Sequence, residues 1–182
     1  MKIIGVGLGL IGGSMLLSLR QIRPELEFLG VDTNSDHLAE ALSLRIIDQK
    51  AEEKDFADAD VVIVSVPVDI SPKIIQDILD KVGEKTLVLD TGSTKDNICR
   101  SLASHPKRGQ FLATHPIAGT EFSGPKAAFS QLFNDKTLII SEIEKTRFQL
   151  QQLAIGLFEK MQMKIRYMNP KDHDQHIAYV SH

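Results

Sequence analysis

Short apolar runs rich in Val, Ile and Leu alternate with amphipathic segments along the whole chain. The apolar runs are typical of strands, and we expect them at residues 2–6, 27–31, 60–67, 86–90, 111–114, 137–141 and 164–168. Residues 46 and 47 are a candidate for one further short strand. Helical periodicity follows residue 12 and recurs at residues 35–43, 70–82, 95–103, 126–133 and 145–161. The pattern predicts an α/β protein with a mostly parallel sheet that is covered by helices on both faces.

The first strand runs into a turn in which three glycines have the spacing G-x-G-x-x-G. In a strand–turn–helix unit, the first glycine allows the tight turn, the second lets a diphosphate approach the backbone, and the third lets the helix lie close to the sheet. The diphosphate then binds to free N–H groups at the helix N-terminus. A glycine-rich turn of another α/β protein is the alternative. The predicted dinucleotide contacts in this turn are Gly7, Gly9, Leu10, Ile11 and Gly12.

Asp32 ends the second predicted strand, about 20 positions after the last glycine of the turn. A carboxylate at this place accepts hydrogen bonds from the ribose hydroxyls of NAD and repels the 2′-phosphate of NADP. No Arg or Lys occurs in the next four residues to bind such a phosphate. Asp32 therefore predicts NAD, with capping of the following helix as the alternative role.

Candidate chemistry lies at the carboxyl ends of the predicted strands, where ligands bind in such sheets. We expect the stretch Ser65-Val66-Pro67 to lie under the nicotinamide half of the cofactor. Ser93 follows the next strand and is either a catalytic hydroxyl or a helix cap, while nearby Lys95 faces an anionic substrate or only solvent. His115 follows the strand after that, and its position favours a functional role over a structural one.

The composition narrows the function classes. The chain has 182 residues, 42% hydrophobic and 25% charged, which fits one globular domain. Its net charge of −3 predicts neither a nucleic-acid nor a membrane partner, and the apolar runs are too short to span a bilayer. The first strand begins at Lys2, so we expect no signal peptide. A single cysteine, Cys99, excludes an internal disulfide and suits the cytoplasm.

Three motifs together resemble the prephenate/arogenate dehydrogenases of tyrosine biosynthesis. Residues 115–124 are similar to the family's signature loop (HPIAGTEFSG), and residues 90–95 to its D-x-x-S-x-K turn. His173-Asp174, Ala178 and Ser181-His182 resemble the start of the helix that leads to the family's second domain. The resemblance implies a doubly wound Rossmann-type domain over residues 1–168. Residues 169–182 would begin a helix with no surface to pack on here, because the helical domain that forms the family's homodimer would be absent from this chain.

The resemblance also implies a reaction. Oxidation of prephenate with hydride transfer to NAD, followed by loss of CO₂, gives 4-hydroxyphenylpyruvate. His115, as a neutral imidazole with a pKa near about 6.5, would take up the hydroxyl proton. Ser93 would bind the same hydroxyl or orient His115, and Glu121 would act as an acidic gate. With Ser93 and His115, the expected substrate-binding residues are Glu121, Ser181 and His182.

Three alternatives stay open at this point. Within the resembled family, the substrate is either prephenate or arogenate. Outside it, the chain could belong to another NAD-linked dehydrogenase, or it could be an NAD-sensing domain without catalysis. The spacing of His173 and His176 places them near one helical face, which could suggest a metal site. We expect no metal, because a zinc site needs three or four well-placed ligands and hydride transfer to NAD needs none.

Overall fold

The computed structural model describes residues 1–181 and contains one sheet of eight strands. They are β1 (Lys2–Val6), β2 (Glu27–Val31), β3 (Gln49–Lys50), β4 (Val61–Val64), β5 (Leu87–Asp90), β6 (Phe111–Pro116), β7 (Thr137–Ser141) and β8 (Lys164–Tyr167). Their order in the sheet is β3-β2-β1-β4-β5-β6-β7-β8. The first six of the chain are parallel; β7 is antiparallel to β6, and β8 is parallel to β7. The predicted Rossmann-type, mostly parallel sheet is thereby confirmed.

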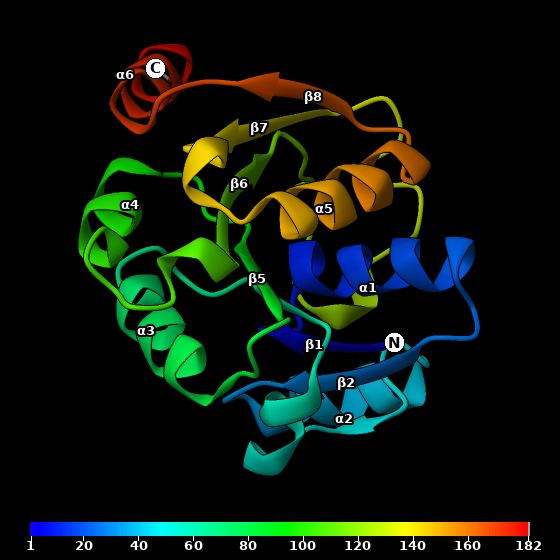
Figure 1. The fold of residues 1–182 in the computed structure, drawn as a ribbon. Coiled ribbons are helices and arrows are strands. Elements are labelled where there is room, and N and C mark those ends of the chain that lie inside the picture. The colour runs from blue at the N-terminus through cyan, green and yellow to red at the C-terminus, as the bar shows by residue number, and fades with distance from the viewer. Residues whose placement is uncertain (182) are drawn as a thin grey trace.

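Helices cover both faces of this sheet (Figure 1). One face carries α1 (Leu10–Ile22), α2 (Ser35–Ser43) and α5 (Phe148–Lys160), whose apolar side chains share one core. The other face carries α3 (Ser71–Lys81) and α4 (Asp96–Leu102), which pack on a second core. The last helix is α6 (Pro170–Val180), and short 3-10 helices occur at Glu53–Asp58 (η1), Arg108–Gln110 (η2), Pro125–Ala127 (η3) and Ile143–Lys145 (η4). Over residues 1–181, none of the helices combines the length and the apolar character that a membrane crossing requires.

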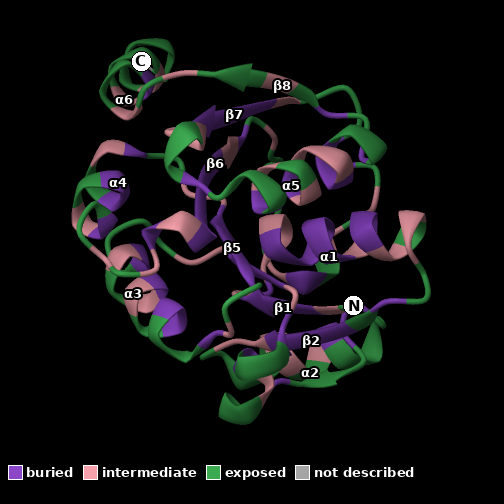
Figure 2. Cartoon of the chain, viewed as in Figure 1, coloured by how far each residue is buried: buried purple, intermediate pink, exposed green. Residues whose placement is uncertain are grey.

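The central strands are buried on both faces, as their unbroken apolar runs predicted. All residues of β4 and β5 are buried, whereas β8 at the edge of the sheet is largely exposed (Figure 2). Side chains of each strand alternate between the two cores because successive residues of a strand point to opposite faces. Val61 and Ile63 pack on the side of α1, and Val62 and Val64 on the side of α3.

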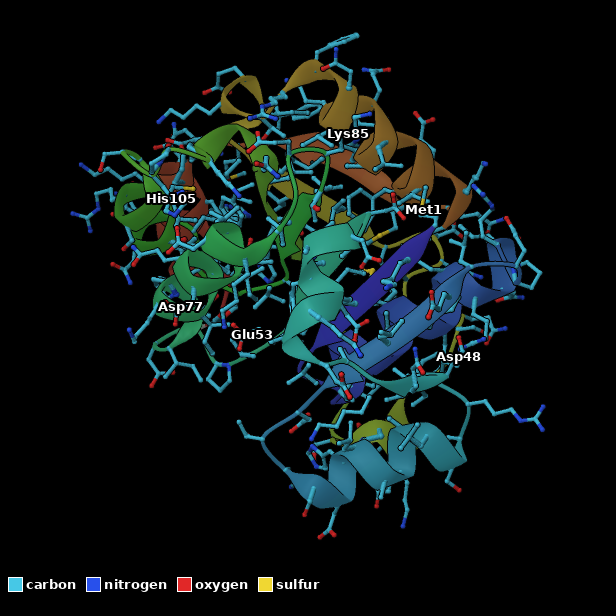
Figure 3. The ribbon with its side chains drawn as sticks, turned by 60° about the horizontal axis from the view of Figure 1, so that its bottom comes forward. Met1, Asp48, Glu53, Asp77, Lys85 and His105 are labelled. Carbon is cyan, nitrogen blue, oxygen red and sulfur yellow. The ribbon has the colours of Figure 1, made fainter. Side chains whose placement is uncertain are left out.

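The direction of the chain across the sheet reverses between β1 and β4, which are neighbours in space. Such a switch point leaves a crevice at the carboxyl ends of the strands, where ligands bind. Met1, Asp48 and Lys85 mark the opposite edge, because they come just before β1, β3 and β5 (Figure 3). The site must therefore be sought on the edge away from these three residues.

Two predicted elements are wrong in detail. Residues 46 and 47 do not form a strand: both N–H groups donate to the carbonyl of Ala41 and close α2, and β3 starts two residues later. Residues 126–133 are not a helix beyond the short η3. The Phe129 N–H donates to Ser14 Oγ and the Ser130 carbonyl accepts from Ser18 Oγ, so bonds to α1 replace helical ones.

The expectation that the last helix has no surface to pack on is also wrong. α6 lies beside α4 (Figure 1), and the carboxylate of Asp174 accepts from the N–H groups of Lys95 and Asp96 at the start of α4. The sequence pattern missed this contact because α6 buries a histidine there rather than an apolar stripe.

Candidate active site

The glycine turn between β1 and α1 has a backbone that other residues would disrupt. Gly7 has φ +89°, and a Cβ at this position would lie 2.2 Å from the carbonyl oxygen of Ser65 on the neighbouring loop. A Cβ at Gly12 would lie 2.0 Å from the carbonyl oxygen of Gly7. The turn and the first turn of α1 thus pack against each other through backbone atoms alone, as the motif predicted.

Gly9 differs from these two glycines, because a Cβ there would meet no protein atom within 4 Å. The open space lies at the N-terminus of α1, and no acidic side chain occupies the helix's first turn. A helix N-terminus that is free of anions attracts a phosphate group through its N–H groups and its dipole. The turn is therefore open to a ligand at Gly9, the position at which the motif requires space for a diphosphate.

Asp32 lies beside this turn at the end of β2. Its carboxylate accepts from the N–H groups of Leu8 and Asn34, both at 2.8 Å. Capping of α2 falls instead to Asn34, whose side chain accepts from the N–H groups of Asp36 and His37. Asp32 is thus held in place by the glycine turn itself, which leaves its role toward the ribose as a prediction.

Two open cavities lie side by side at the carboxyl edge of the sheet, and Ser93 lines both of them. The first, of about 420 Å³, continues from α1 along the loop after β4. The second, of about 500 Å³, lies over the end of β6. The first is lined by Ile11, Ser65, Val66, Pro67, Val68, Asp69, Thr91, Gly92 and Ser93, and the second by Ser93, His115, Ile117, Ala118, Gly119, Lys136, Ile177, Val180 and Ser181. The structure therefore brings the predicted nicotinamide stretch and the predicted catalytic pair together.

His115 reaches the second cavity from β6, where its own strand position leaves it half-buried. Burial, and next the neighbouring His173, lower the pKa of His115 from 6.5 to about 4. The expected pKa near 6.5 is therefore wrong, because burial lowers it, but the imidazole is neutral at physiological pH as expected. Its Nδ1 lies 2.9 Å from Nε2 of His173, a residue 58 positions later on α6.

The other predicted site residues lie as follows. No hydrogen bond joins Ser93 to His115 in the part of the chain that is described, so any role of Ser93 in orienting the imidazole stays a prediction. Glu121 is exposed on the loop after β6 and lines neither cavity. Ser181 lines the second cavity, whereas His182 lies outside the described residues.

Lys95 was expected to face either a substrate or solvent, and both expectations are wrong. Its side chain is fully buried and its ammonium group pairs with the buried carboxylate of Asp90. Asp90 also accepts from the N–H groups of Gly92 and Thr114, so it ties β5 to β6 and to the Ser93 turn. A buried lysine is stable only with such a partner. Lys95 therefore supports the floor of the site and does not contact what enters it.

Sequence reasoning missed one functional candidate, Lys136, and gave no role in the site to two others. Lys136, just before β7, lines the second cavity and forms no ion pair with any residue described. The pairing of the strands could have indicated Lys136. Because β7 is antiparallel to β6, the residue just before β7 lies beside the end of β6. His173 and Asp174 were singled out only as part of a family motif, and no local pattern connects them to His115.

Comparison with known proteins adds independent information. Residues 16–167 match the family described as "Prephenate dehydrogenase, nucleotide-binding domain". The chain is 33% identical to a curated prephenate dehydrogenase of Lactococcus lactis; the match covers all of this chain and 50% of that protein. The chain thus spans about half the length of this relative.

Two solved structures have the same fold. One is a prephenate dehydrogenase from Aquifex aeolicus in complex with hydroxyphenyl propionate and NAD⁺, with TM-score 0.87 and 30% identity over 96% of this chain and 62% of that one. The other is an arogenate dehydrogenase from Synechocystis, with TM-score 0.89 and 26% identity over 100% of this chain and 64% of that one.

Proposed function

The chain belongs to the prephenate dehydrogenase family, and we propose that the protein carrying it oxidises prephenate to 4-hydroxyphenylpyruvate with NAD, in tyrosine biosynthesis. The observation that carries this proposal is the neutral imidazole of His115. It faces a cavity that adjoins, at Ser93, the cavity running to the glycine turn. A proton acceptor next to a dinucleotide cleft is what an alcohol oxidation requires.

The residues at the switch point fit NAD. Gly9 leaves space for a diphosphate at the start of α1, and Asp32 presents a carboxylate beside the same turn. Ser65, Val66 and Pro67 line the cavity on the side of Ser93, where the nicotinamide half would lie. NAD, when bound, supplies the acceptor for the hydride. The NAD⁺ of the Aquifex structure supports the same assignment.

The protein's own part in the reaction is to hold the substrate and take up one proton. As the ring carbon loses hydride, the hydroxyl on it becomes a carbonyl, and its O–H bond must break. We assign that proton to His115, whose low pKa keeps the imidazole neutral at physiological pH, so that one ring nitrogen has a free lone pair. Loss of the ring carboxylate as CO₂ then yields the aromatic product, which makes the step effectively irreversible. We assign Ser93 to a hydrogen bond with the same hydroxyl, because Ser93 lines the cavity of His115.

The substrate carries two carboxylates, and Lys136 is the one Lys or Arg among the described residues that line the cavity of His115. We assign Lys136 to an anionic group of the substrate. Arogenate is the second candidate substrate, because it shares the ring of prephenate and the Synechocystis relative is an arogenate dehydrogenase. The remaining assignments, Glu121 as a gate and Ser181 and His182 as substrate contacts, rest on the family motifs.

Substitution of His115 in the full-length protein tests the proposal. His115→Asn should lower kcat by about two orders of magnitude, the usual scale for a general base, and should leave the Kd of NAD unchanged. His105→Asn is the matched control, because His105 lies outside both cavities. A near-normal kcat in His115→Asn would show that the histidine is structural and that its assignment as the proton acceptor is wrong.

We also propose that the full-length protein is a cytoplasmic homodimer. The motifs of the family, whose second domain forms the dimer, and the single cysteine support this. Light scattering of the full-length protein would give twice the mass of one chain, and a monomer at micromolar concentration would contradict the proposal.

A further inference from the structure

The carboxylate of Asp174, in the second turn of α6, accepts three hydrogen bonds. The donors are the N–H groups of Lys95 at 2.7 Å and Asp96 at 2.9 Å, and Nδ1 of His173 at 2.8 Å. Burial acts to raise the pKa of Asp174, but the hydrogen bonds from His173, Asp96 and Lys95 outweigh it and lower the pKa. An ionised carboxylate has only acceptors, so Nδ1 of His173 must carry a hydrogen.

This hydrogen determines the other nitrogen of His173. The side chain is fully buried, and burial lowers its pKa even though Asp174 acts against that. The ring is therefore neutral, and with the hydrogen on Nδ1 its Nε2 is an acceptor. This Nε2 lies at hydrogen-bond distance, 2.9 Å, from Nδ1 of His115, which must then be the donor.

The reverse arrangement is unfavourable. If both rings carried their hydrogens on the opposite nitrogens, the bare Nδ1 of His173 would face the carboxylate of Asp174 at 2.8 Å. Two acceptors would then lie at hydrogen-bond distance with no hydrogen between them, and a charge-assisted bond would be lost. The order of donors and acceptors from Asp174 to His115 is thus fixed in one direction.

We propose that His173 and Asp174 are positioning residues that hold His115 in the tautomer with hydrogen on Nδ1 and a free lone pair on Nε2, an inference that rests on the proposed function of His115. In this tautomer the substrate's O–H bond breaks and its proton forms a bond to Nε2. The electron pair of the O–H bond becomes the second bond of the carbonyl, and the hydride leaves the ring carbon for the nicotinamide. His115 is then an imidazolium that still donates from Nδ1 to His173. In the other tautomer Nε2 already carries a hydrogen and accepts nothing.

Two variants of His173 in the full-length protein separate positioning from packing. His173→Leu fills the buried space without an acceptor and should lower kcat for prephenate by about tenfold to a hundredfold, with the Kd of NAD unchanged. His173→Gln places an amide oxygen near the position of Nε2 and should keep kcat within about fivefold of the wild type. His176→Leu, on an exposed position of the same helix, is the control and should behave as the wild type. Unchanged kcat in His173→Leu, or equal loss in the Gln and Leu variants with folding intact by circular dichroism, would overturn the proposal.

The tautomer itself is measurable without turnover. In the full-length protein labelled with ¹⁵N-histidine, the His115 resonances, assigned by their loss in His115→Asn, should show a protonated Nδ1 and a bare Nε2. His173→Leu should shift this pattern toward a protonated Nε2. An active wild type with hydrogen on Nε2 of His115 would overturn the positioning role. An inactive wild type with the expected resonances would overturn the proposed reaction while supporting the assigned tautomer.

Discussion

The buried neutral state of His115 should make the stability of the fold depend on pH. Its pKa is about 4 in the folded chain and 6.5 when the ring is free in water. Between these values the unfolded chain binds a proton that the folded chain does not. The contribution of His115 to the unfolding free energy is therefore fully present above pH 6.5 and is lost as the pH falls toward 4. The full shift corresponds to about 3 kcal/mol, and because one side of the ring faces an open cavity we expect about 2 kcal/mol.

Urea unfolding followed by circular dichroism measures this directly. Between pH 7.5 and 4.5 the wild-type chain should lose about 2 kcal/mol more unfolding free energy than His115→Asn, because asparagine does not titrate. Burial lowers the pKa of His173 in the same way. Because both proteins contain His173, its contribution to the pH dependence largely cancels in the difference between them. His176→Asn, exposed on α6, should follow the wild type. Parallel curves for the wild type and His115→Asn would mean that His115 is charged or solvated in the folded chain.

Three further variants test the cofactor turn and the substrate cavity. Asp32→Ala should narrow the preference for NAD over NADP by about tenfold in a binding titration, and a wild type that prefers NADP would refute the assignment. Gly12→Ala places a Cβ 2.0 Å from the carbonyl oxygen of Gly7, so NAD affinity should fall at least about tenfold by calorimetry, whereas Gly156→Ala, with no atom within 4 Å, should not change it. In the full-length protein Lys136→Met should raise the KM for prephenate about tenfold with little change in kcat, and an unchanged KM would remove it from the substrate site.

The elements that the sequence could predict are those whose determinants are local. The unit from β1 to Asp32 is defined by apolar runs, by glycines at fixed spacing and by one acid, all within the first 32 residues. The position of Lys95, by contrast, depends on contacts between distant segments and could not be predicted. A lysine in a turn is usually solvated, and only the packing of β5 against β6 reveals that Asp90 is buried and available as its partner. The stretch after η3 has the apolar spacing of a helix, and the sequence therefore predicted one. It is not helical because side chains of α1 supply its hydrogen-bond partners.

The acid–base part of the site depends on contacts between distant segments. His115 and His173 lie 58 positions apart, and their contact exists only because β7 and β8 return the chain to the edge where α6 begins. His173 is the one buried residue of that helix, so α6 has little apolar surface to hold it in place. Its attachment comes from the hydrogen bonds of His173 and Asp174 instead. Apolar packing tolerates small shifts because it has no direction, whereas hydrogen bonds weaken steeply with angle and distance. A helix attached through directional bonds therefore sets the orientation of the imidazole that it contacts, and the same bonds that dock α6 leave Nε2 of His115 free.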